Sequence, residues 1–158
     1  MDMQKPQISV SITRAAGAPV NPTRGELEKL FARTWALVPK KKRPETQGST
    51  RLLVDVHLQG DEEMARLNWA HMKHRGPTDV LAFNLDEFDP ERKGFSLGEI
   101  VIGFETAKRE ATERKLPVTE ELSRYCVHGF LHLLGYEDDT AAQQRTMFEV
   151  QEKALNVR

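Results

Sequence analysis

The run Ile100-Val101-Ile102 constrains the fold of this chain more than any other feature of its sequence. A strand with aliphatic side chains on both of its faces is typically buried on both faces, as a central strand of a sheet is. Such a strand needs other strands along its edges and further elements packed across its faces. We therefore expect Glu99 to Phe104 to be a central strand, and the rest of the chain must supply the elements that surround it.

Three further segments have the pattern of β-strands. Apolar and polar residues alternate from Gln7 to Thr13 and again from Leu52 to Leu58, which is the period of a strand with one buried face. The segment from Asp79 to Leu85 is also predicted to be a strand. The polar stretch from Asp86 to Leu97 contains a proline and a glycine, and we expect it to be a loop.

Five segments are predicted to be helices. The first begins after Thr23, which has capping-box spacing to Glu26, and apolar residues recur at helical spacing up to Val38. The others are a short helix from Asp61, an exposed polar helix from Thr106 to Lys115, a helix from Pro117 to about Leu134, and a last helix that follows the capping pair Thr140 and Gln143 and has Met147, Phe148 and Leu155 as apolar residues. These elements predict an α+β, sandwich-like fold, in which a small mixed sheet of four strands packs with about five helices.

Length and composition narrow the class of protein. The whole chain, 1–158, is expected to be a single globular domain, with 39% hydrophobic and 30% charged residues. No apolar run approaches the ~20 residues of a membrane span, and the first residues lack the apolar core of a secretion signal, so we expect neither a membrane partner nor export by that route. The one cysteine, Cys126, excludes an internal disulfide and fits a reducing compartment.

Charge gives a weaker indication of the partner. The formal net charge of −1 does not favour a nucleic-acid-binding protein, because such domains are often basic overall. The four consecutive cations from Lys40 to Arg43 form either a solvated loop or a local contact for phosphate groups. In the second case, the affinity for nucleic acid would fall as the salt concentration rises.

The most informative segment contains two histidines near the end of a predicted helix. His128 and His132 are four residues apart, one helical turn, and lie about 40° apart around the helix axis, away from its main apolar stripe. Two imidazoles at this spacing either occupy a solvated face or bind one metal ion, and a catalytic tetrahedral site would need a third ligand. Gly135 ends the helix and the acids Glu137 to Asp139 follow at once, so a carboxylate there could reach the ion.

This pair differs from the zinc-peptidase motif, which needs a glutamate directly after the first histidine as general base. Here that position is Gly129, which disfavours a metallopeptidase. A hydrolase built on this helix must take its base from elsewhere, or use a metal ion that lowers the pKa of a water molecule to about 7.

The same stretch resembles the signature of the YbeY family of bacterial rRNA maturation factors, His-Gly-x-Leu-His-Leu-x-Gly-Tyr-Asp-His. It is matched from His128 to Tyr136, and Glu137 stands in for the acid. Further family blocks occur in order at Leu67-Asn68 with Pro77 to Phe83, at Leu97 to Ile102, and at Met147, which lies where the family has a methionine after the metal loop. The resemblance covers about Leu52 to Met147, and three ordered blocks make it specific.

The resemblance implies a cytoplasmic, metal-dependent endoribonuclease that is specific for single strands. The family processes rRNA, chiefly at the 3′ end of 16S rRNA, and acts in ribosome quality control. The implied partners are ribosomal RNA and ribosomal subunits, and no DNA. The family fold is a small mixed sheet with helices, and three motif histidines bind one divalent metal ion, usually assigned as zinc.

Two positions depart from the family pattern. The third metal position is Asp138, and because a carboxylate is a legitimate zinc ligand, the expected ligand set is His128, His132 and Asp138. This set carries one more negative charge than three histidines, so it should acidify water less and favour harder ions. Met72 lies where the family has an arginine linked to activity, and the nearby Arg75 is the expected substitute, with His71 and His74 as other candidates.

One further acid is a candidate for catalysis. Glu99 lies at the family's acidic position at the start of the predicted central strand, and it either acts beside the ion or simply pairs with a neighbouring cation. The predicted catalytic residues are thus Glu99 and Arg75. The nucleophile, water or the ribose 2′-OH, is left open.

Two functions follow from these expectations. The first is a metal-dependent endoribonuclease with zinc as its ion. The alternative is a ribosome-associated assembly factor with a structural metal and little catalytic activity, which the departures at Met72 and Asp138 favour. Phe83 and Tyr125 are expected to be packed in the fold, although either could instead stack on a base.

Overall fold

The computed structural model describes residues 5–156 of the chain. Within this range the elements are β1 (Gln7–Arg14), α1 (Arg24–Leu37), the short 3₁₀ helix η1 (Lys40–Lys42), β2 (Arg51–Gln59), α2 (Asp61–Met72), β3 (Val80–Asp89), β4 (Gly94–Gly103), α3 (Phe104–Arg114), α4 (Val118–Leu133) and α5 (Ala141–Leu155). The four predicted strands and five predicted α-helices are therefore all present. No helix in the described range is long and apolar enough to cross a membrane.

The four strands form one mixed sheet in the order β1-β2-β4-β3. β2 pairs in parallel with β1 on one side and with β4 on the other, whereas β3 is antiparallel to β4. β4 thus lies inside the sheet, where Ile100 and Val101 are 0% and 7% exposed. The aliphatic run correctly predicted a central strand, and the α+β class with a small mixed sheet is confirmed.

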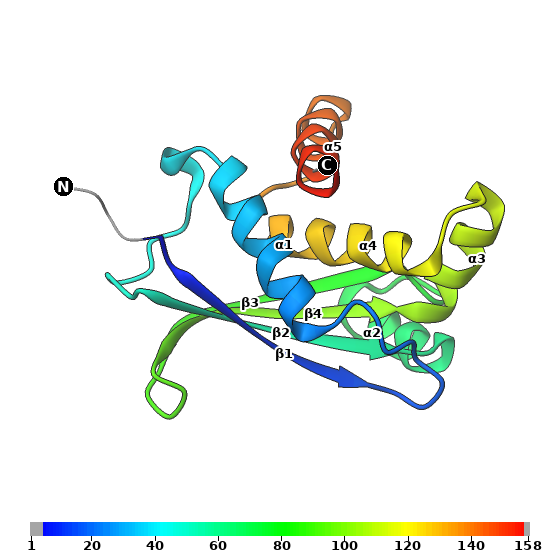
Figure 1. Cartoon of the computed structure of the whole chain (residues 1–158). Coiled ribbons are helices and arrows are strands. Elements are labelled where there is room, and N and C mark those ends of the chain that lie inside the picture. The colour runs from blue at the N-terminus through cyan, green and yellow to red at the C-terminus, as the bar shows by residue number, and fades with distance from the viewer. Residues whose placement is uncertain (1–4, 157–158) are drawn as a thin grey trace.

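The two sides of the sheet differ in their cover. Helices α1, α4 and α5 lie on one side (Figure 1), and the main core lies between them and the sheet, where the rings of Phe31 and Phe130 stack with centres 4.4 Å apart. On the other side, α2 covers one end of the sheet around Met64, Leu81 and Val101. The rest of that side carries polar side chains on β1, β2 and β4, and we call it the open face.

The segment from Asp86 to Leu97 is not the predicted loop. β3 and β4 extend through most of it and form a hairpin closed by residues 90–93. The carboxylate of Asp89 closes the turn, because it accepts hydrogen bonds from the backbone N–H groups of Glu91 and Arg92. Residues 84–88 of the edge strand β3 are all exposed, so this part of the strand has no buried face to impose an apolar alternation on its sequence.

Helix α3 begins two residues earlier than expected and is less exposed than its charged sequence suggests. Phe104, Ala107 and Ala111 lie at helical spacing and are buried, and they form a narrow apolar stripe against the rest of the protein. Two of the three are alanines, which is why the stripe was not visible as a hydrophobic pattern.

Helix α4 carries the two motif histidines and lies directly on the sheet. Gly129 makes this close approach possible, because a Cβ atom there would lie 2.5 Å from Cγ2 of Ile100. At the end of the helix, the side-chain amide of Asn84 on β3 donates a 2.8 Å hydrogen bond to the carbonyl oxygen of Leu133. The sheet thus sets the position of the histidines.

Helix α5 packs on α4 on the side away from the sheet (Figure 1). Arg124 of α4 donates two 3.0 Å hydrogen bonds to the carboxylate of Glu152 and one of 3.2 Å to the fully buried Glu121. Arg33 of α1 donates hydrogen bonds of 3.1 and 3.0 Å to the carbonyl oxygen of Ala154 near the end of α5. These contacts tie α5 to both neighbouring helices.

Candidate metal centre

The loop after α4 brings an acid back to the two histidines. α4 ends at Leu133, and Gly135 then reverses the chain with a φ of +99°, which residues with side chains rarely adopt. The N–H group of Tyr136 donates a 3.0 Å hydrogen bond to the carbonyl oxygen of Leu131, so the reversed chain stays against the helix. Asp138 follows two residues later and lies beside the histidine face of α4.

Three donor atoms converge at this point. The Nε2 atoms of His128 and His132 are 3.1 Å apart, and each lies 3.5 Å from Oδ2 of Asp138. A tetrahedral zinc ion with bonds of about 2.0–2.1 Å has ligand atoms about 3.3 Å apart, so these separations match the edges of such a site. His128, His132 and Asp138, which we call the metal trio, therefore form a group that could hold a metal ion.

Hydrogen bonds on the far side of each ring orient the two imidazoles. Nδ1 of His132 lies 3.0 Å from the carbonyl oxygen of Tyr136, and Nδ1 of His128 lies 3.0 Å from Oε1 of Gln151. The amide nitrogen of Gln151 donates to Glu152, which leaves the amide oxygen for the imidazole. Because a carbonyl oxygen can only accept, each neutral ring carries its proton on Nδ1 and keeps a lone pair on Nε2. Two lone pairs that face each other and a carboxylate are suited to a cation between them.

The loop that carries Asp138 has little freedom. Thr140 accepts a hydrogen bond from the backbone N–H group of Gln143, whose side-chain oxygen accepts from the N–H groups of Asp139 and Thr140. The predicted capping box at the start of α5 is thus confirmed. Gln144 also donates a 2.9 Å hydrogen bond to the carbonyl oxygen of Asp138. The third donor is therefore held in place by the N-terminal turn of α5.

A small hollow gives access to the metal trio. It has a volume of about 200 Å³ and is lined by His128, Asp138, Gln144, Met147, Phe148 and Gln151. The side chains of the trio are 27–42% exposed, so a substrate can reach them from solvent. The hollow lies between α4 and α5, and α5 contributes most of its wall.

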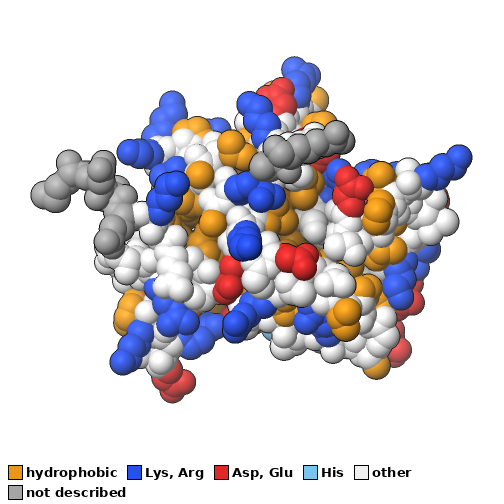
Figure 2. Space-filling model, viewed as in Figure 1, with side chains coloured by type: hydrophobic (Ala, Val, Ile, Leu, Met, Phe, Trp, Pro, Cys, Tyr) orange, Lys and Arg blue, Asp and Glu red, His pale blue; other side chains and the backbone are white. Residues whose placement is uncertain are grey.

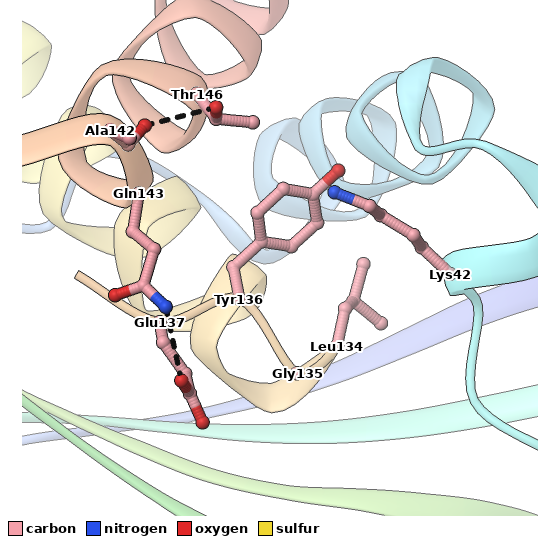
Figure 3. A pocket seen from close by; sticks show the side chains of 8 residues that line it. All are labelled: Lys42, Leu134, Gly135, Tyr136, Glu137, Ala142, Gln143 and Thr146. Carbon is pink, nitrogen blue, oxygen red and sulfur yellow. Dashed lines mark hydrogen bonds between the residues drawn. The ribbon is translucent and has the colours of Figure 1, made fainter. Parts of the chain in front are cut away.

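A larger groove lies against the same loop. It has a volume of about 480 Å³ and is lined by Lys42, Leu134, Gly135, Tyr136, Glu137, Ala142, Gln143 and Thr146 (Figure 3). The ammonium group of Lys42 lies 5.1 Å from the ring centre of Tyr136, within reach of a cation–π interaction. The groove thus has a positive charge on one wall and the metal loop on another.

The basic run therefore lies near the candidate centre. Lys40, Lys41 and Lys42 form η1 and are exposed. In Figure 2, blue side chains gather at the upper left, where Figure 1 shows the chain that follows α1. Sequence alone did not place this run beside the metal loop, because nothing in the chain indicated that the end of α1 lies next to the end of α4.

Glu99 lies on the other side of the sheet from the metal trio. Ile100 faces α4 beneath Gly129, and side chains alternate along a strand, so Glu99 points to the open face. There its Oε1 lies 3.3 Å from Nε2 of His57, whose Nδ1 is 2.5 Å from the hydroxyl group of Thr13. Glu99 is therefore on the other side of the sheet from the metal trio, and of the two roles expected for it, this geometry favours pairing with a neighbouring side chain. We call Thr13, His57 and Glu99 the sheet-face cluster.

Met72 is the last residue of α2, and Arg75 lies in the loop that follows it. The guanidinium carbon of Arg75 is 5.8 Å from the ring centre of Trp69, and Met72 is 52% exposed. Within residues 5–156, no hydrogen bond or ion pair joins Arg75 to the metal trio. The expected substitution of the family arginine by Arg75 is therefore not supported by any contact at the site.

Cys126 and Tyr125 are both packed in the fold, and for Tyr125 this was expected from the sequence. Cys126 is 1% exposed on the core side of α4, and burial raises the pKa of its thiol to about 12, so it is neither a nucleophile nor a metal ligand. Tyr125 is 9% exposed and burial likewise raises its pKa. Phe83 is partly buried and packs against His71, with ring centres 4.9 Å apart.

Several residues of the site had no signal in the sequence. Gln151 supports His128 from 23 positions away, and Phe148 belongs to the apolar pattern of the last helix. Lys42 comes from a run that was expected to be either solvated or a phosphate contact, with no indication that it lies beside the metal loop. A glutamine and a phenylalanine on an amphipathic helix are ordinary residues. Only the packing of α5 on α4 shows that they line the hollow.

The fold and the site define a small α+β protein with a candidate metal centre. Helix α4 lies on the mixed four-stranded sheet and carries two histidines, and the loop that follows α4 carries the carboxylate. The family model described as Endoribonuclease YbeY matches residues 19–157. This chain belongs to that family, and the resemblance inferred from its motifs is confirmed.

Individual relatives agree with the family assignment. Curated proteins named Endoribonuclease YbeY from Moorella thermoacetica and Bifidobacterium animalis subsp. lactis are 39% identical over 109 residues and 36% identical over 141 residues. These matches cover 65% and 85% of this chain, and 70% and 75% of the relatives. A solution structure of a Thermotoga maritima protein matches 94% of this chain and 86% of its own with a TM-score of 0.54 and 28% identity.

Proposed function

We propose that this protein is a metal-dependent, single-strand-specific endoribonuclease of the cytoplasm that processes ribosomal RNA at the 3′ end of 16S rRNA and acts in ribosome quality control. Its ion is a single divalent metal, zinc, held by His128, His132 and Asp138. Membership of the Endoribonuclease YbeY family supports the reaction class. The convergence of two Nε2 lone pairs and a carboxylate oxygen is the observation that carries the metal dependence.

The donor set fits zinc. Two imidazole nitrogens and one carboxylate oxygen are common zinc ligands, and three protein ligands leave a fourth position for water or substrate. When bound by these residues, a divalent ion would polarise the scissile phosphate, neutralise charge that develops on it, and lower the pKa of a water molecule. Asp138 makes the site less positive by one unit than three histidines would, so harder divalent ions compete better here than in a relative with three histidines.

The protein's own groups keep this site ready for an ion and a substrate. Gln151 and the carbonyl group of Tyr136 hold the imidazole protons on Nδ1, which leaves both Nε2 atoms as ligands. Lys42, across the metal loop, supplies a positive charge for the RNA backbone beside the scissile phosphate.

The test is cleavage of a single-stranded RNA with and without a chelator. We expect chelation and His128→Ala each to abolish cleavage, and added zinc to restore the chelated wild type but not the variant. His57→Ala is the matched control, since it removes a histidine from the open face and should cleave like the wild type. Undiminished cleavage after complete metal removal defeats the proposal. Products that end in a 2′,3′-cyclic phosphate identify the 2′-OH as nucleophile, and products with a 3′-hydroxyl and a 5′-phosphate at the cut identify water.

The alternative is an assembly factor with a structural ion and little nuclease activity. Its specific support is that, within residues 5–156, no arginine forms a hydrogen bond or ion pair with the trio, and that Met72 occupies the family's arginine position. In that case the protein binds ribosomal subunits in a salt-sensitive way. His128→Ala then lowers thermal stability without removing any RNA cleavage.

A further inference from the structure

Phe148 is an exposed aromatic residue at the edge of the metal hollow. The large apolar side chains that are exposed within residues 5–156 are Val20, Leu37, Trp69, Met72, Leu85, Phe88 and Phe148. Of these seven, Phe148 alone lines a hollow that also contains two members of the metal trio. Its ring is not part of the core, because the residue is 58% exposed.

The packing of α5 explains why this ring faces solvent. The helix buries Met147, Gln151 and Ala154 against its neighbours. Phe148 follows Met147 by one position, about 100° around the helix, and therefore lies beside the buried stripe, where it lines the hollow. A phenylalanine that is 58% exposed gives the fold only part of the stabilisation that full burial would. We therefore look for its role in the binding of a ligand.

The size of the hollow decides where a nucleotide can go. Its volume of about 200 Å³ is smaller than the roughly 300–1,000 Å³ of pockets that enclose whole small molecules. A hollow of this size admits a phosphate group at the trio but not a whole nucleotide, so the attached base extends beyond it. Phe148 lines the hollow and is 58% exposed, so its ring is available to that base.

We propose that Phe148 is the stacking platform for one unpaired base next to the phosphate bound at the metal trio. This rests on the proposed function as an endoribonuclease. Aromatic side chains stack on any base because every base has a π-face, so the contact is tolerant of sequence. A base inside a duplex already has both faces stacked on its neighbours and cannot lie on Phe148. The ring thus selects single-stranded RNA without reading its sequence.

Binding measured separately from cleavage tests the inference. The probe is a fluorescein-labelled single-stranded hexamer of 2′-O-methyl RNA, titrated with the intact zinc-loaded protein and followed by anisotropy. Gel electrophoresis after each titration checks that the probe is uncleaved. We expect Phe148→Ala to raise the Kd about 5- to 150-fold, and Phe148→Leu, which keeps an apolar side chain but no ring, to raise it nearly as much. Phe148→Tyr should bind like the wild type. Phe88→Ala is the control, because Phe88 is 48% exposed on the hairpin and lies outside the hollow.

Two further RNAs separate stacking from other contacts. For a duplex of the same sequence, the Kd should be the same for wild type and Phe148→Ala. For a hexamer of abasic nucleotides, the loss on substitution should disappear. Equal affinity of Phe148→Ala and wild type for the ordinary hexamer, or an equal loss with the abasic one, overturns the inference, even if chelator-sensitive cleavage stands. If cleavage survives chelation while Phe148→Ala still weakens binding, the metal proposal fails and the stacking site remains.

Discussion

The helix-covered side of the sheet and the open face each carry histidine beside a carboxylate. In the metal trio, both Nδ1 atoms have carbonyl acceptors, and two Nε2 atoms and Asp138 point to a common centre. In the sheet-face cluster, Nε2 of His57 lies against Glu99 and Nδ1 against Thr13. Beside it, Asp55 is paired with Arg92 at 2.8 Å.

The difference lies in which groups are already satisfied. On the open face, His57 has neighbours on both ring nitrogens and Asp55 is paired with Arg92, so the cluster gains little from a cation. The trio is held from behind and leaves lone pairs free in front, which is the arrangement that metal ligands need. Residue types alone do not distinguish the two clusters, whereas the direction of each lone pair does.

The first prediction contrasts an ion pair on each side. Arg124 is 14% exposed and is the main partner of the fully buried Glu121, so Arg124→Ala should lower the free energy of unfolding by about 3–5 kcal/mol. Arg92 is 40% exposed on the open face, and Arg92→Ala should lower it by less than about 1 kcal/mol. Urea denaturation measures both. Equal losses would show that the two sides do not differ in how they bury charge.

Arg124→Ala should also change how the free energy of unfolding depends on pH. Burial raises the pKa of Glu152, but hydrogen bonds from Arg124 and Gln151 lower it more, so its pKa lies below the ordinary 4.5. A carboxyl group with a lowered pKa stabilises the fold above its unfolded pKa, and this contribution is lost as the pH falls through the folded value. Stability below pH 4.5 should therefore fall less steeply in Arg124→Ala than in the wild type.

The second prediction contrasts the two carboxylates. Asp138→Ala should weaken zinc binding by at least about 100-fold, because loss of a ligand exceeds the 10–100-fold effect of losing its hydrogen-bonded support. Glu99→Ala should bind zinc like the wild type, since Glu99 faces His57 on the open face. Elemental analysis of the purified chains, followed by competition with a chelating dye, gives the stoichiometry and affinity. Zinc loss in Glu99→Ala would contradict the separation of the two clusters.

The third prediction concerns the groups behind the imidazoles. Gln151→Leu removes the acceptor of the His128 proton and should weaken zinc binding about 10- to 100-fold. Thr13→Val removes the corresponding neighbour of His57 and should have no effect on zinc. Chelator competition again provides the measurement. Unchanged affinity in Gln151→Leu would mean that ring orientation does not depend on this bond.

The smallest expected effect concerns the basic run. Lys42→Gln should reduce the slope of log binding constant against log salt for single-stranded RNA by about 1, because one phosphate contact is lost. Lys93→Gln removes an exposed charge from the hairpin turn and should leave the slope unchanged. Anisotropy titrations at several salt concentrations test this pair. The same slope in both variants would place the RNA away from the groove beside Lys42.

The sequence predicted the parts of the site that are local in the chain. His128 and His132 share a helix face by their spacing. Gly135 ends that helix and Asp138 follows six residues after His132, so the convergence of the two histidines and the aspartate could be anticipated. Glu99 could not be placed, because alternation along a strand shows that faces differ but not which face α4 covers. The need for a glycine at 129 likewise becomes visible only when β4 lies beneath it.

The hydrogen bond from His128 to Gln151 has a consequence for the folding of the site. Helix α5 follows the three proposed ligands in the chain and supplies the acceptor behind one of them, part of the wall of the hollow and the ring of Phe148. A partly unfolded form in which α5 has left α4 keeps every proposed ligand but loses the scaffold that orients them. The competence of the site should therefore be lost by local unfolding of α5, before the sheet itself unfolds.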